Sequence, residues 1–331
     1  MNDIQSTINE LTKNTDIRTS VFEIEVQGLK NSTLTLGGRV LDASQLEELR
    51  QLLPLLKLET SAVRVLRREP GEKVHVATTL TGLYEKPSFG RRRASELTYG
   101  TELEVLDTED QWVFTRQSDG YLGWVYRPFL SQGLVPQATH LVLTPASEVR
   151  AQPGDACEVV TRLVSGTAVT VEESQDDWSR ITANRSGWLP TRNLRSLHHL
   201  PGTLEEKRTV IVEDAKRMVG VPYMWGGVSG NGIDGSGFAR LLHRWIGIQI
   251  PRDADMQYIA AHQVDAPYES GDLFFFQDAE GGRRIAHVGV SLGGWNMIHS
   301  SRSNNGVYVD DLQQSPLMST FISAGSFLRE R

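Results

Sequence analysis

Two histidines near the end of the chain have the setting needed for nucleophilic chemistry. His287 lies in "RIAHVGVSL" and His299 in "NMIHSS", two predicted neighbouring strands. Imidazoles on adjacent antiparallel strands can lie side by side on one face. A helix is predicted to begin at Gly235, and the free amides of a helix N-terminus stabilise an anion. A nucleophile at such a terminus, faced by two histidines, would have a base and a residue that orients the base.

Two other interpretations of the histidines are weaker. A lone histidine in a strand is often structural, and this interpretation applies to the other six histidines of the chain. A zinc site would need further ligands, and neither a cysteine nor a close carboxylate stands at ligand spacing. We therefore expect no metal and no other cofactor.

The segment "NGIDGSGF" (residues 231–238) places glycine where this arrangement needs a nucleophile. Ser236 is an alternative, because Gly235-Ser236-Gly237 resembles a nucleophile elbow. That motif requires glycine two residues before the serine, and Asp234 stands there. One step along a helix also rotates a side chain by about 100°, away from His287. The only cysteine, Cys157, lies in an earlier domain and is expected to be a small buried hydrophobe.

The first 68 residues predict a small αββαβ domain. Ile4, Ile8 and Leu11 mark one face of a helix, and residues 22–26 alternate apolar and charged side chains as a half-buried strand does. A strand over residues 33–40, a helix from Ser44 and a strand "SAVRVLRR" complete the unit. This order resembles a BON-type domain.

Residues 72–198 contain an internal repeat. Each copy has a strand that begins near a glycine, an acidic turn, a strand with tryptophan and a closing Gly-Trp strand, as in "DGYLGWVYRPFL" and "RSGWLPTRNL". A repeat of this length implies two copies of one fold. The pattern resembles two bacterial SH3-like barrels, over residues 72–135 and 136–198. Their tryptophans are expected to be core or seam aromatics: Trp112, Trp124, Trp178 and Trp188.

Residues 199–331 predict an α+β domain. Thr203 and Glu206 have capping-box spacing, so a helix should start there and end near Met218. The helix at Gly235 should end near Gly247, and strands are predicted over residues 272–276, 285–292 and 295–299. Helices followed by an antiparallel sheet are typical of this class.

The motifs of this last domain resemble, in order, the NlpC/p60 family of cell-wall cysteine peptidases. They are "PYMWGG", "GIDGSGF", "PRDADMQ", "SGDLFFF", "AHVGVSLG" and "MIHS". The resemblance implies a multi-domain protein with two SH3-like β-barrels, a papain-like α+β NlpC/p60 domain and the small N-terminal αββαβ domain. The pair of barrels is similar to that of γ-D-glutamyl-L-diamino-acid endopeptidases, which trim peptidoglycan stem peptides.

The resemblance also implies roles for single residues. His287 matches the catalytic base, His299 the residue that orients it, and Gly235 the position of the nucleophilic cysteine. The remaining matches concern substrate binding: Tyr223 and Trp225 as an aromatic wall, Asp234 and Ser236 beside the free L-Ala end of the peptide, and Glu85 and Tyr121 of the first barrel closing that end. A solvated turn residue is the competing interpretation of Glu85.

The expected partner is a peptidoglycan-derived peptide with a free N-terminal L-Ala, cut between D-Glu and a diamino acid. Because Gly235 lacks the thiol, the chain as given is expected to be inactive, through a deliberate or recent change or as a natural pseudoenzyme. The alternative function is a muropeptide-binding pseudoenzyme that does not cut. An amidase acting on the sugar–peptide link is a third, weaker possibility.

Bulk composition excludes two classes of partner. A net charge of −7 argues against nucleic acid, which requires a basic face. No apolar run approaches the ~20 residues of a membrane span. The N-terminus lacks the basic and apolar regions of a secretory signal, so we expect a cytoplasmic protein, unless the N-terminus was trimmed.

Overall fold

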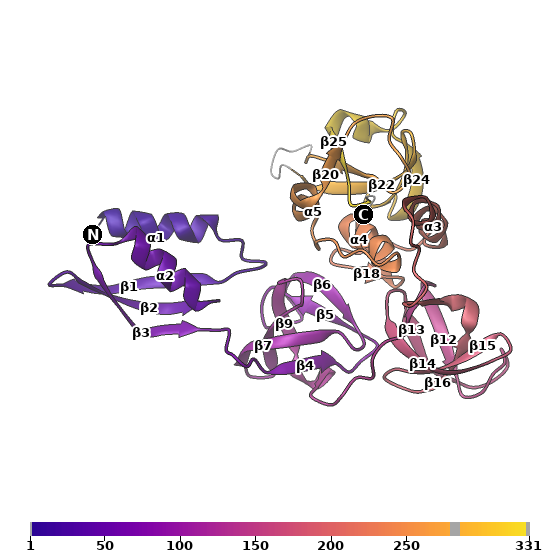
Figure 1. The fold of residues 1–331 in the computed structure, drawn as a ribbon, viewed down its shortest axis with the longest axis horizontal. Helices are drawn as coiled ribbons and strands as arrows, with labels where there is room; N and C mark the ends of the chain where they lie inside the picture. Colours follow the sequence, from indigo (N-terminus) through magenta and orange to yellow (C-terminus); the bar gives the residue numbers. More distant parts are fainter. Residues whose placement is uncertain (1, 279–284, 329–331) are drawn as a thin grey trace. The chain divides into compact units, whose positions relative to one another are not determined.

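The computed structural model describes residues 2–278 and 285–328 and divides into two compact units. The first unit comprises the residues up to Val74, Tyr84–Arg92 and Glu102–Gln132. The second unit comprises His75–Leu83, Arg93–Thr101 and the residues from Gly133 on. Strands of the first SH3-like barrel therefore belong to both units. Figure 1 labels the helices and strands along the chain.

The N-terminal domain has the expected αββαβ order: α1 (Asn2–Asn14), β1 (Phe22–Lys30), β2 (Thr33–Val40), α2 (Ala43–Leu52) and β3 (Lys57–Val65). β2 is the central strand, antiparallel to β1 and parallel to β3. The apolar side chains that alternate along β1 and β2 are buried with Ile8 and Leu49 of the two helices. The predicted last strand, residues 61–68, was placed four residues late, because its parallel pairing with β2 begins at Lys57.

Within the first unit, this domain packs on the barrel strands β7 (Glu102–Glu109), β8 (Trp112–Arg116) and β9 (Leu122–Tyr126). Leu41 and Leu66 share a buried cluster with side chains of these strands. Arg67 also pairs with Glu104 at 3.1 Å. The N-terminal domain is therefore anchored by both apolar and ionic contacts.

Short antiparallel strands build both barrels. In addition to β7–β9, the first barrel contains β4 (Lys73–Val76), β5 (Leu80–Tyr84), β6 (Arg93–Thr98), a 3-10 turn (Arg127–Phe129) and β10 (Leu130–Ser131). The second barrel contains β11 (His140–Val142), β12 (Ala146–Arg150), β13 (Val159–Val164), β14 (Ala168–Gln175), β15 (Trp178–Thr182), β16 (Gly187–Pro190), a 3-10 turn (Thr191–Asn193) and β17 (Leu194–Ser196).

Two expectations for the barrels are corrected or refined. Trp112 and Trp124 are buried, whereas Trp178 and Trp188 are only half-buried at the barrel surface. Cys157 is also half-buried rather than buried, because it lies in a turn between β12 and β13, where its Sγ donates to Pro153 O at 3.7 Å.

The C-terminal domain begins with α3 (Leu204–Arg217), the hairpin β18 (Val228–Ser229) and β19 (Gly232–Ile233), α4 (Gly235–Trp245) and α5 (Ala254–Ala260). A six-stranded sheet follows in the order β20-β25-β21-β22-β23-β24. Its strands are β20 (His262–Val264), β21 (Leu273–Phe276), β22 (His287–Gly293), β23 (Asn296–Ser301), β24 (Gly306–Asp311) and β25 (Phe321–Ser326), with a 3-10 turn (Pro316–Thr320) before β25.

The predicted helices and the three predicted strands of this domain are present, with shifted ends. β20, β24, β25 and α5 were not predicted. β22 begins two residues later than expected, because residues 285 and 286 precede the ladder that starts at His287. The expected 199–331 range also includes residues 279–284 and 329–331, which lie outside the described residues.

Helix α4 packs on the sheet and also on the second barrel. Phe238 and Leu242 share a core with Val288 and Val290 of β22. Trp245, fully buried, donates from Nε1 to Val142 O of the second barrel at 3.1 Å. Both neighbours therefore fix the position of the helix on which the predicted nucleophile site stands.

His243 on this helix should make the protein sensitive to acid. It is fully buried, and burial lowers its pKa to about 4. In the unfolded chain His243 takes up a proton near pH 6.5, whereas in the folded chain it stays neutral until about pH 4. Stability therefore falls as the pH drops. We expect this residue to lower the free energy of unfolding by about 2 kcal/mol between pH 7 and pH 5. Urea unfolding at both pH values should show a correspondingly smaller drop for His243→Leu.

Candidate active site

The start of α4 is held by the carboxylate of Asp234. Asp234 is the N-cap residue, and its Oδ1 accepts from Gly237 N at 2.7 Å. Its Oδ2 accepts from Gly226 N at 2.8 Å. Gly237 must be glycine here, since a Cβ at that position would lie 2.2 Å from Gly227 O. The cap thus fixes both the helix and the loop that precedes it.

Gly235, the first residue of α4, lies directly beside His287. A Cβ built on Gly235 would be 3.0 Å from His287 Nδ1 and 3.1 Å from Val288 O. Residue 235 does not have a left-handed backbone, so the backbone does not require glycine there. A side chain at position 235 would need the imidazole to move by a few tenths of an ångström and would then touch it.

The two histidines form a hydrogen-bonded pair. His287 Nε2 lies 2.8 Å from His299 Nδ1, and His299 Nε2 lies 2.9 Å from Asp310 Oδ2. Gly289 of β22 leaves room for the side chain of Met297, because a Cβ there would lie 2.8 Å from Met297 Sδ and 3.4 Å from His299 Cβ. Burial, with a smaller effect of His299, lowers the pKa of His287 to about 3. Burial also lowers the pKa of His299, although Asp310 opposes this effect. Both rings are therefore neutral at neutral pH.

Arg252, which lies in the loop before α5, connects the helix cap to the first barrel. Its guanidinium is 1% exposed and contacts Asp234 through two nitrogens, at 3.1 and 2.8 Å. It also donates to Ser236 Oγ at 2.9 Å and to Ser95 Oγ of β6 at 3.0 Å. Because Ser236 is bound in this network and Asp234 is the cap, both predicted substrate-binding residues have structural partners.

Removing this guanidinium should be costly. Arg252→Met leaves the buried carboxylate of Asp234 without its countercharge, and breaking a buried ion pair typically costs about 3–5 kcal/mol. The backbone amides at Gly226 and Gly237 still support Asp234, so we expect a loss near 3 kcal/mol. Urea unfolding measures it. Arg162→Met, which removes an exposed partner of Glu148, is the matched control and should change stability little.

Glu96 of β6 provides a second buried connection to the loop before α4. Its carboxylate accepts from Val228 N at 3.1 Å and Ser229 Oγ at 3.0 Å, and it pairs with Arg93 at 3.1 Å. Burial raises the pKa of Glu96 despite these partners. Arg93 also donates to Trp225 O at 3.3 Å. Strand β6 is therefore part of the surroundings of the site.

The predicted substrate-binding residues fall into two groups. Tyr223 bridges to Ile233, two residues before Gly235, and the side chain of Trp225 on the same loop is exposed. Glu85 and Tyr121 belong to the other compact unit. There Glu85 lies 3.6 Å from Arg92, and Tyr121 is buried. The structure thus brings Tyr223, Trp225, Asp234 and Ser236 to the start of α4, whereas the substrate-binding role of Glu85 and Tyr121 stays a prediction.

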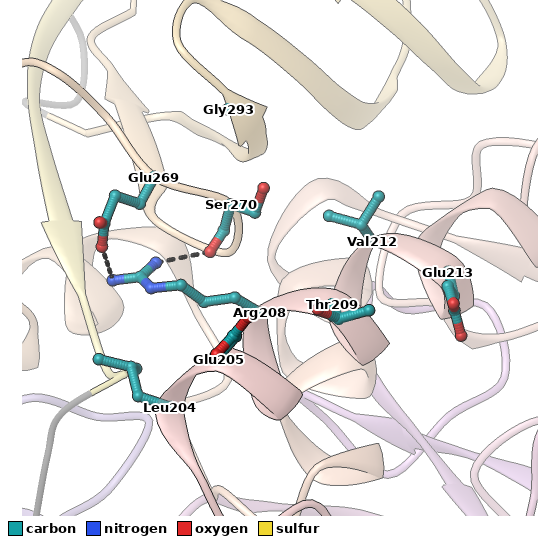
Figure 2. Close-up of a pocket in the computed structure, with 9 residues that line it drawn as sticks. All are labelled: Leu204, Glu205, Arg208, Thr209, Val212, Glu213, Glu269, Ser270 and Gly293. Atoms are coloured by element: carbon teal, nitrogen blue, oxygen red, sulfur yellow. Dashed lines mark hydrogen bonds and ion pairs between the residues drawn. The ribbon is translucent and has the colours of Figure 1, made fainter.

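A cavity of about 680 Å³ lies elsewhere in this domain, along α3 (Figure 2). Arg208 crosses it and binds Glu269 Oε2 and Ser270 O, both at 2.6 Å. None of the nine residues that line it is a predicted site residue. Both terminal nitrogens of the guanidinium have partners, while its buried Nε has none among the described hydrogen bonds. Arg208 thus links α3 to the segment before β21, away from the predicted site residues.

Sequence analysis missed three polar residues around the site: Glu96, Arg252 and Asp310. Glu96 lies in a barrel strand, so its sequence neighbours give no hint of its contacts. The Pro-Arg motif pointed to Arg252 without a role. Among the described residues, no group of three histidine, cysteine or acidic side chains is arranged as a metal site. No described helix combines the length and apolar character that a bilayer crossing requires.

Comparison with known sequences agrees with this architecture. Residues 220–326 match the NlpC/P60 family, residues 83–127 the bacterial dipeptidyl-peptidase SH3 domain and residues 146–195 the bacterial SH3 domain. The chain carries an NlpC/P60 domain and two bacterial SH3 domains. The NlpC/P60 domain contains Gly235, both histidines and every other predicted site residue except Glu85 and Tyr121.

Two relatives extend the similarity across the SH3 domains. A γ-D-glutamyl-L-lysine dipeptidyl-peptidase of Bacillus cereus is 26% identical over 69% of this chain and 73% of its own length. Dipeptidyl-peptidase 6 of Lysinibacillus sphaericus is 26% identical over 73% of this chain and 93% of its own length. The crystal structure of an NlpC/P60 family protein from B. cereus superposes with a TM-score of 0.68 at 21% identity, covering 78% of this chain and all of that one. This similarity shows a shared fold.

Proposed function

We propose that the NlpC/P60 domain is the catalytic domain of a peptidoglycan hydrolase, of the type that cuts between D-Glu and a diamino acid in stem peptides. The observation that carries this proposal is the position of Gly235 at the start of α4, where a Cβ would lie 3.0 Å from Nδ1 of the paired His287. The activities for which the relatives are named, γ-D-glutamyl-L-lysine dipeptidyl-peptidase among them, supply the substrate class.

With cysteine at position 235, the chemistry is acyl transfer. His287 takes the thiol proton through Nδ1, and the thiolate attacks the γ-carbonyl of D-Glu. Amides at the start of α4 can stabilise the oxyanion of the tetrahedral intermediate. The C–N bond breaks as His287 returns the proton to the leaving amine, and water then releases L-Ala-D-Glu from the thioester with His287 as the base.

The chain with Gly235 holds this site without its nucleophile. Its helix cap, histidine pair and Arg252 network are intact, while residue 235 ends at Cα. That combination favours a second candidate function, the binding of a muropeptide without cleavage. The two functions share one recognition site and differ only in the covalent step.

We infer that a carboxylate of the first SH3 domain binds the free amino group of L-Ala. Glu85 was predicted for this role, which stays a prediction. Glu96 is an alternative, supported by its burial beside Ser229 in the same compact unit as the histidines. An ionised carboxylate accepts about four hydrogen bonds, and Glu96 receives three. Glu85→Gln and Glu96→Gln should each be tested with the free and the N-acetylated peptide. The variant that no longer distinguishes the two peptides identifies the carboxylate that binds the amino group.

The proposed function is tested with Gly235→Cys and three substrates: L-Ala-γ-D-Glu-diaminopimelate, its N-acetylated form and the same peptide attached to muramic acid. Mass spectrometry identifies the bond that is cut. We expect release of L-Ala-D-Glu from the free peptide alone. Cleavage of the sugar–peptide link would establish amidase activity instead, and no cleavage of any substrate would overturn the peptidase assignment.

A further inference from the structure

His299 has a second partner on the side away from His287. Asp310, in β24, places Oδ2 2.9 Å from His299 Nε2. Antiparallel pairing sets His299 opposite Tyr308, so Asp310 stands two residues along on the same face and reaches diagonally. The His299 side chain is 1% exposed and that of Asp310 is 29% exposed. The three side chains His287, His299 and Asp310 thus cross three neighbouring strands, β22, β23 and β24.

This contact determines where the protons of both rings lie. A carboxylate oxygen can only accept, so Nε2 of His299 carries a hydrogen and donates it to Asp310. In neutral His299, Nδ1 is then the acceptor, and His287 Nε2 must donate to it across 2.8 Å. The remaining nitrogen of His287, Nδ1, is left with its lone pair, and this nitrogen is the one beside Gly235.

We propose that Asp310 is a positioning residue of this site, which acts through His299 to keep the unprotonated Nδ1 of His287 directed at residue 235. Without the carboxylate, His299 can take either tautomer. The tautomer with hydrogen on Nδ1 would place that hydrogen against Nε2 of His287 and force the proton of His287 onto Nδ1. His287 would then present a donor where a base is needed. The catalytic consequence rests on the proposed function, whereas the tautomers themselves do not.

The carboxylate of Asp311, next to Asp310, has only structural contacts. Asp311 accepts from Gln313 N at 3.0 Å and Gln314 Nε2 at 2.7 Å, and so caps the turn after β24. It contacts neither histidine in the described hydrogen bonds. Asp311→Asn is therefore a matched control for Asp310→Asn, with the same chemical change one residue away.

The first test uses the unsubstituted chain, with glycine at position 235. Imidazole ¹⁵N spectra at pH 7 should show both histidines protonated on Nε2 and unprotonated on Nδ1. Asp310→Asn should mix the tautomers of both rings, and Asp311→Asn should leave them unchanged, with unchanged thermal midpoints as the folding control. A His299 protonated on Nδ1 in the parent, or equal changes in both variants, would overturn the proposal.

The second test places both substitutions in Gly235→Cys. Asp310→Asn should lower kcat about 10- to 100-fold with KM unchanged, less than the ~10⁴-fold known for an Asp that contacts the base directly. Asp311→Asn should leave kcat unchanged, and equal losses in the two variants would contradict a positioning role. If Gly235→Cys itself has no activity, the proposed function fails, and the ¹⁵N spectra of the parent still decide the role of Asp310.

Discussion

Gly235→Cys should convert the chain from an inert protein into a peptidase. The new Cβ falls 3.0 Å from His287 Nδ1, and Cys at the first position of α4 gains the helix N-terminal field as well as the base. Removing a catalytic nucleophile costs about 10⁶-fold in kcat in a serine protease, so restoring one should raise turnover of L-Ala-γ-D-Glu-diaminopimelate by at least about 10⁴-fold. Release of L-Ala-D-Glu measures it.

The thiol itself gives an independent measure of the same environment. Its pKa should fall well below the usual value of about 8.5, so iodoacetamide should alkylate it rapidly at pH 6.5. The parent contains only Cys157, whose labelling supplies the background rate. Gly235→Ser is the matched control for turnover and should stay inert, because a serine hydroxyl is far less acidic than a thiol and burial lowers the pKa of the base, His287, to about 3. Slow alkylation together with no turnover would contradict the predicted environment.

Loss of His287 should have the second largest effect. In the Gly235→Cys background, His287→Ala removes both the base that takes the thiol proton and the acid that protonates the leaving amine. We expect kcat to fall by at least about 10³-fold and the thiol pKa to rise toward 8.5. The rate of product release measures kcat, and the pH dependence of alkylation measures the thiol pKa.

Two controls make that result specific. His262→Ala removes an exposed histidine at the start of β20 and should leave kcat unchanged. His299→Ala should give an intermediate loss, since it removes the partner of His287 Nε2 but keeps the base. Retention of full activity by His287→Ala would mean that another group activates the thiol.

The sequence predicted the centre of the site because that centre depends on local patterns. An amphipathic run predicted a helix that begins at Gly235, and α4 begins there, with Asp234 as its N-cap. Alternation along two β-like runs then placed His287 and His299 on facing positions, and the two rings are hydrogen-bonded. The helix start at Gly235 and the two histidine strands are more than 50 residues apart in sequence. The order of motifs in a known family indicated that they meet in one site.

The surroundings of the site could not be predicted in the same way. The sequence around Glu96 is that of an ordinary barrel strand, and only the fold brings this residue to Ser229, 133 residues later. Asp310 lies near the end of a strand that was not predicted, because "GVYVDD" has acidic residues where a strand pattern would continue. Glu85 matched a family position by sequence alone, and a long-range contact of this kind cannot be tested by pattern.

The central claim is that this chain recognises its peptide and lacks only the covalent step. Calorimetric titration of the Gly235 chain with L-Ala-γ-D-Glu-diaminopimelate, followed by mass spectrometry of the recovered peptide, tests it directly. We expect saturable binding of one peptide per chain and recovery of the peptide intact, while Gly235→Cys cleaves the same sample. Cleavage by the Gly235 chain, or absence of binding to it, would contradict the claim.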